Sequence, residues 1–151
     1  MKDLADLNGQ IGAVTWAGVI YKTILDTADT GGAMSIVDTW SPAGSGPPRH
    51  VHHAEDEVFI LLSGRTKIWL EGEEFIREAG EAVFIPRGKE HTFRVTDDGP
   101  SRHIIILTPG GFEGFFYDMA DGQYRIPDDM PQIVESAERN NLTFTGPPLE
   151  G

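Results

Sequence analysis

The chain has 151 residues, which is enough for one domain with a hydrophobic core but few for two. It contains no cysteine, and this excludes disulfides, cysteine-ligated metal sites and thiol nucleophiles. Its 24 acidic and 12 basic residues give a net charge of −12, which repels phosphate backbones and anionic membrane surfaces. We therefore expect one domain over residues 1–151 that binds neither nucleic acid nor a membrane.

The beginning of the chain, MKDLADLNGQ, lacks a basic start followed by an apolar run. No stretch of the sequence approaches the apolar length that a membrane span needs. These two observations predict a soluble, cytoplasmic protein.

Residues 12–108 consist of short runs rich in Val, Ile, Thr and aromatic residues, separated by Gly, Pro and Asp at turn positions. This pattern predicts an all-β core, either a closed barrel or a sandwich. The expected strands, in chain order, are 13–25, 33–40, 50–53, 57–62, 66–70, 74–78, 82–85, 92–96 and 102–108.

The C-terminal tail has a different pattern, because residues 111–119 and 128–140 carry apolar side chains at helical spacing. We expect two short helices within 111–140 that pack on the outside of the barrel. The cluster of Phe112, Phe115 and Phe116 is interpreted as docking this tail or as building a dimer interface. The Gly-Pro-Pro sequence at 146–148 is expected to end regular structure.

Histidines and one glutamate form the candidate chemical site. The two-residue period of a strand points His50 and His52 to one face, with Cα atoms roughly 6.5–7 Å apart. Glu57 shares its parity with Phe59, so a carboxylate can stand beside the histidines above an apolar floor. His91 opens a later strand after a Pro–Gly turn and makes a third imidazole available.

Two blocks of the sequence resemble the paired motifs of the cupin family. Their residues are Gly44-x5-His50-x-His52-x4-Glu57-x6-Gly64 and Gly80-x5-Pro86-x-Gly88-x2-His91. The resemblance spans residues 44–95 and is to the single-domain, quercetinase-like cupins. It implies a double-stranded β-helix, or jelly-roll, barrel with short C-terminal helices. The second motif usually ends in Asn, where this chain has Val95, so the pocket wall loses a polar group.

The resemblance also implies the ligand set, one divalent metal ion held by His50, His52, Glu57 and His91. Three imidazoles and a carboxylate suit Fe, Mn, Co, Ni, Cu or Zn, and the sequence does not select among them. Such a site leaves one or two coordination positions open, which favours an enzyme. In quercetinase-like cupins the motif glutamate can act as a base on a substrate hydroxyl, which makes Glu57 the candidate catalytic residue.

Five further residues are candidates for a substrate pocket. They are Trp40, Phe59, Phe93, Val95 and His103. Aromatic residues in barrels are more often simple core, and His103 is more often a hydrogen-bonded or exposed histidine than a catalytic one. His53 has the opposite strand parity from the ligands and is expected on the exterior or behind the ligand shell.

The leading functional hypothesis is an oxidoreductase, a quercetinase-like dioxygenase that acts on a small enolic or phenolic molecule. One alternative is a redox-neutral metal-dependent lyase, isomerase or cyclase, in which the ion acts as a Lewis acid. Another is a non-catalytic cupin that binds a small molecule. A third is a cupin whose bound ion only stabilises the fold. Members of the family commonly form dimers, so the resemblance implies a homodimer.

Overall fold

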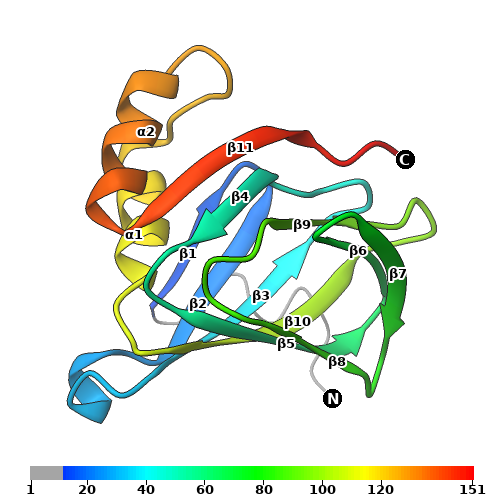
Figure 1. Cartoon of the computed structure of the whole chain (residues 1–151), viewed down its shortest axis with the longest axis horizontal. Helices are drawn as coiled ribbons and strands as arrows, with labels where there is room; N and C mark the ends of the chain where they lie inside the picture. Colours follow the sequence, from blue (N-terminus) through cyan, green and yellow to red (C-terminus); the bar gives the residue numbers. More distant parts are fainter. Residues whose placement is uncertain (1–11) are drawn as a thin grey trace.

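The structure, a computed structural model, describes residues 12–151 and contains two antiparallel sheets that form a jelly-roll β-barrel (Figure 1). The larger sheet holds, in spatial order, β1 (Ala13–Trp16), β2 (Val19–Leu25), β3 (Ser35–Ser41), β10 (Ser101–Thr108), β5 (Asp56–Ser63) and β8 (Ala82–Ile85). The smaller sheet holds β11 (Leu142–Pro148), β4 (Pro48–His52), β9 (His91–Val95), β6 (Arg65–Leu70) and β7 (Glu73–Glu78). The predicted all-β, jelly-roll fold class is confirmed.

Strand β5 shows how the sequence sets the inside of the barrel. It lies between β10 and β8, and its alternate residues Glu57, Phe59 and Leu61 are buried. Val58 and Ile60 point to the opposite face, where they are only partly buried. The inward residues of both sheets interdigitate into one core, in which Val37, Ile68 and Leu107 are fully buried, so strand parity fixes which residues reach the interior.

The predicted strand over 13–25 is in fact two strands. Ala17 and Gly18 form a two-residue turn, and both have positive φ angles, 51° and 80°. This is the geometry of a tight hairpin, and it pairs Trp16 with Val19. Alanine rarely adopts a positive φ, so only the glycine of this turn is a recognisable turn signal in the sequence.

Both predicted helices are present, as α1 (Glu113–Gly122) and α2 (Met130–Arg139). Figure 1 shows them together beside the barrel, and α1 contacts β1 while α2 contacts β11. Phe112 and Phe115 join the main core cluster, so this tail forms part of the barrel wall and is not only an external cover. Within residues 12–151, no helix is long and apolar enough to cross a membrane.

Regular structure ends at Pro148, within the expected 146–148 segment, but it ends a strand, β11, that the sequence pattern did not predict. β11 is an edge strand and pairs with β4, where Leu142 lies opposite His52 and Phe144 opposite His50. The register shifts between Phe144 and Pro148. Proline is tolerated on an edge strand because one side of that strand makes no ladder hydrogen bonds, and the sequence pattern alone does not show that a strand lies at an edge.

Candidate metal centre

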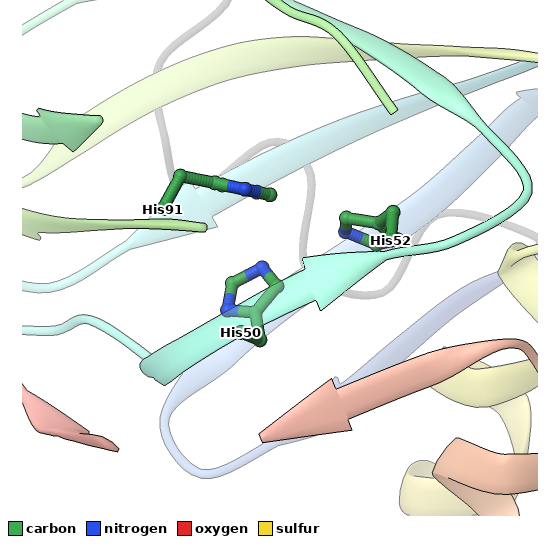
Figure 2. A group of neighbouring side chains, drawn as sticks. All are labelled: His50, His52 and His91. Carbon is green, nitrogen blue, oxygen red and sulfur yellow. The ribbon is translucent and has the colours of Figure 1, made fainter. Parts of the chain in front are cut away.

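Three histidines of the smaller sheet point toward one another (Figure 2). His50 and His52 come from β4 and His91 opens β9, where it pairs directly with His50. All three side chains are buried, and one ring nitrogen from each lies within 4.8 Å of the other two. The turn before β9 is held in place because the Gly88 N–H donates to the carbonyl of His52 at 2.8 Å. The two sequence motifs therefore meet at one point.

Backbone carbonyls fix the tautomers of two of these rings. Nδ1 of His50 lies 2.8 Å from the Pro48 carbonyl oxygen, and Nδ1 of His91 lies 2.9 Å from the Lys89 carbonyl oxygen. A carbonyl only accepts, so each Nδ1 carries the proton and donates it. In the neutral imidazole, Nε2 then has a free lone pair, which is the form that binds a metal.

Glu57 approaches the histidines from the larger sheet. Its Oε1 lies 3.1 Å from Nε2 of His91, and its Oε2 lies 3.6 Å from Nε2 of His52. Nδ1 of His91 already holds a proton, so in the neutral ring Nε2 is an acceptor. The Glu57 carboxylate that faces it is also an acceptor, and the contact is favourable only when a proton or a cation lies between the two atoms. The site therefore attracts positive charge.

A second carboxylate lies behind His52. Oε1 of Glu55 is 3.8 Å from Nδ1 of His52, and both atoms are buried without a closer hydrogen-bond partner among residues 12–151. A carboxylate at this position can accept the Nδ1 proton and leave Nε2 free for a metal, as outer carboxylates do in many metal sites.

Burial and neighbouring charges shift the pKa values of the site in different directions. Burial lowers the pKa of His50 well below its usual value, and the nearby His91 and His52 lower it further. Burial also acts to lower the pKa of His52, but the carboxylates of Glu57 and Glu55 outweigh this and raise it. Burial acts to raise the pKa of Glu57, but the facing histidines, led by His52, lower it to about 2. The site thus contains an ionised carboxylate.

This donor set fits a divalent transition metal ion. It offers three imidazoles, two of them with fixed tautomers, and one carboxylate whose negative charge offsets part of the charge of a dication. The contact between His91 and Glu57 would be unfavourable without a positive charge between its two acceptors. His50, His52 and His91 can therefore hold an ion, with Glu57 as the fourth ligand proposed from the sequence.

A cavity of about 410 Å³ opens beside this cluster. His50, His52 and Glu57 line it, together with aromatic side chains from both the barrel and the tail. Three of the five predicted pocket residues are in its wall, namely Phe59, Phe93 and His103. Within the described chain, the lining includes no Lys or Arg side chain.

Trp40 and Val95 are not among the described residues that line this cavity. Trp40 alternates along β3 with Thr39 and Ser41, which do line the cavity, so its indole points to the other face of the sheet. Val95 points inward but is fully buried at the far end of β9 from His91, where it belongs to the core. Parity alone does not tell a core position from a cavity position.

The tail supplies cavity residues that sequence reasoning did not assign to the site. Phe112, Phe115 and Phe116 line the cavity, and the ring of Phe112 packs edge-on against His52 with a centroid distance of 4.3 Å. Their helical spacing is visible in the sequence, but their position at the cavity depends on tertiary packing. His53 is exposed and its Nε2 contacts the Thr143 hydroxyl at 2.8 Å, so it lies on the exterior as predicted.

The comparison with protein families agrees with this geometry. The family profile of the cupin domain matches residues 37–107, which contain all four proposed ligands. The chain belongs to the cupin superfamily. A cupin-like protein of Thermotoga maritima has a similar structure, with a TM-score of 0.59, 16% identity, and coverage of 92% of this chain and 84% of that one.

Two other relatives carry names that describe an activity. Quercetin 2,3-dioxygenase of Bacillus subtilis is 26% identical over 102 residues, which are 68% of this chain and 30% of that enzyme. The chain therefore spans about a third of that relative's length. The polyketide cyclase RemF of Streptomyces resistomycificus is similar in structure, with a TM-score of 0.54, 25% identity, and coverage of 64% of this chain and 67% of that one.

Proposed function

We propose that this cupin is a metal-dependent enzyme of quercetinase-like type, an oxidoreductase that acts on a small enolic or phenolic molecule and dioxygen. One observation carries the proposal: His50, His52 and Glu57 of the buried cluster stand at the wall of an aromatic cavity of about 410 Å³. That volume lies within the range of small-molecule sites. A structural ion would not need a cavity beside it.

The lining of the cavity supports a flat, uncharged substrate. Phe59, Phe93 and Phe112 offer ring faces and edges for stacking, and no cationic side chain of the described chain is there to bind a phosphate or carboxylate. The protein carries a net charge of −12, which also disfavours anionic substrates. An aromatic or conjugated phenol or enol fits these conditions.

Different residues of the chain would bind the metal and transfer the proton. His50, His52 and His91 would hold Fe, Mn, Co, Ni, Cu or Zn, which when bound supplies Lewis acidity and, for the redox-active ions, electron transfer. Glu57 would accept the proton of a substrate hydroxyl, because its carboxylate lines the cavity beside the histidine cluster. Phe112 and Phe115 cover the site from the side of the tail and exclude water.

A redox-neutral cyclase is the second candidate, and the aromatic cavity together with the likeness to RemF favours it. Dioxygen distinguishes the two reactions. The protein is loaded separately with Fe(II), Mn(II) and Zn(II), then incubated with flavonols and other planar phenols while oxygen uptake and products are recorded. Oxygen uptake in step with product, with Fe or Mn but not Zn, is the expected result. Conversion with Zn and no oxygen uptake would favour the cyclase, and retained binding without any product would favour a non-catalytic cupin.

A further inference from the structure

His103 is a buried histidine of the cavity that the proposed chemistry does not use. It lies on β10, is 2% exposed, and lines the same cavity as His50 and Glu57. Neither of its ring nitrogens has a hydrogen-bond partner in the described part of the chain. Buried polar groups are nearly always paired in folded proteins, because an unpaired one lowers stability. An unpaired imidazole at a cavity wall is therefore available to a ligand.

Aromatic neighbours pack against this ring but form no hydrogen bond with its nitrogen atoms. The ring packs edge-on against Phe59 and Phe93, with centroid distances of 5.1 and 5.3 Å. Thr39 donates to the backbone carbonyl of His103 and leaves the imidazole free. Burial lowers the pKa of His103 to about 4, so near neutral pH the ring is uncharged and offers one donor and one acceptor.

The strand register places His103 at a different level of the cavity from Glu57, although the Glu57 carboxylate still acts to raise the pKa of His103. Leu107 of β10 pairs with Glu57, whereas His103 pairs with Leu61. Four residues along a strand separate these two levels, which corresponds to roughly 13 Å between Cα atoms. Phe59 lies between them, so the cavity has a polar group at each level and an aromatic wall in the middle.

We propose that His103 is a positioning residue that recognises a second polar group of the substrate, a hydroxyl or carbonyl, at the end of the cavity away from the metal histidines. The inference rests on the proposed function and narrows its substrate class. The substrate is a planar, uncharged molecule of two or three fused or linked rings, with a hydroxyl at one end for the metal centre and a hydrogen-bonding group at the other.

Two probes of matched shape test this inference, 2-naphthol and 2,6-dihydroxynaphthalene. Each is titrated into Zn(II)-loaded protein and binding is followed by fluorescence. The wild type should bind the diol more tightly than the mono-ol. His103→Phe should weaken diol binding roughly tenfold, the effect of losing one buried hydrogen bond, and leave 2-naphthol unchanged or tighter. His103→Gln, which keeps a donor and an acceptor, should retain most of the diol preference.

The NMR chemical shifts of the His103 ring nitrogens report direct contact with the ligand. They would not change on diol binding if His103 had only a structural role. They should change when the wild type binds the diol and stay constant with 2-naphthol. Equal weakening of both probes in His103→Phe, no preference for the diol, or failure of the wild type to bind either probe would overturn the inference. Zinc content, measured in the same samples, separates the two proposals. Diol preference in a protein that holds no zinc would contradict the proposed function and leave the role of His103 intact.

Discussion

Glu57 and His91 come from opposite sheets of the barrel, yet Oε1 of Glu57 lies 3.1 Å from Nε2 of His91. The Nδ1–H of His91 donates to the Lys89 carbonyl, so when the imidazole is neutral and the Glu57 carboxylate is ionised the two facing atoms are both acceptors. A cation between them would convert this repulsion into two favourable contacts. The contact therefore links metal binding to the joining of the two sheets.

Metal content should depend on the inward histidines and not on their exposed neighbour. His91→Ala and His50→Ala each remove an imidazole without a substitute donor, so we expect a large loss of bound metal by elemental analysis. His53→Ala is the matched control and should keep normal metal content. If His53→Ala emptied the site while His50→Ala did not, the ligand assignment would be wrong.

Removal of the metal should lower the melting temperature. An ion that binds only the folded barrel stabilises it in proportion to the logarithm of its concentration, by about 2.7 kcal/mol at 100 times Kd. Chelation of the wild type should remove this stabilisation, whereas chelation of His91→Ala should have little effect. If the wild type had the same melting temperature before and after verified removal of the metal, the ion would not stabilise the fold.

Glu57→Gln should separate binding from proton transfer. The amide oxygen keeps the shape and some coordination, but the charge and the basic group are lost. We expect turnover of a phenolic substrate to fall about a hundredfold or more, while metal content falls much less. Full turnover in this variant would exclude Glu57 as the base.

Glu55→Ala should weaken metal binding although Glu55 is not a proposed ligand. Its carboxylate lies 3.8 Å from Nδ1 of His52, and loss of such an outer partner typically costs about 10–100-fold in metal affinity. Asp56→Asn is the control, because the adjacent Asp56 pairs with Arg87 near the surface and faces away from the site. Competition titration with a chromophoric chelator measures both. Equal affinities in the two variants would remove Glu55 from the site.

His103 should make the stability of the metal-free protein depend on pH. Its pKa is about 4 in the folded protein, against 6.5 for an unperturbed histidine, so between these values the unfolded chain binds more protons. The free energy of unfolding should therefore fall as pH drops from about 6.5 to 4, by roughly 3 kcal/mol from this group. Urea denaturation of wild type and His103→Phe at both pH values measures the difference. The variant should lose less stability on acidification, and identical losses would show that burial does not shift this histidine.

The strand pattern and the two motifs predict most of the barrel and the cluster of histidines, because parity and loop spacing are local properties. His50, His52 and His91 are brought together by one β-ladder pair, His50 opposite His91, which follows once the motif turn at Gly88 is recognised. The sequence therefore contains enough information to place these side chains.

The cavity depends on tertiary packing that no local pattern records. The aromatic character of Trp40 predicts a pocket position, but Thr39 and Ser41 have the inward parity. The helical spacing of Phe112 predicts an anchor for the tail, yet this ring closes over His52. Which of several similar aromatic residues reaches a cavity depends on distant elements meeting. The homodimer and the cytoplasmic location stay predictions.

The pairing of β11 with β4 has a consequence for the order in which the protein forms during synthesis. β4 carries His50 and His52, but it pairs with β9 only at His50 and with β11 at four positions. The ribosome makes residues 142–148 about ninety positions after β4, so these contacts have a long sequence separation and close late. A nascent chain that ends before β11 would hold its two strand histidines without their principal backbone partner. We therefore expect tight metal capture to be one of the last events of folding, with hydrogen exchange at β4 slowing only after β11 has docked.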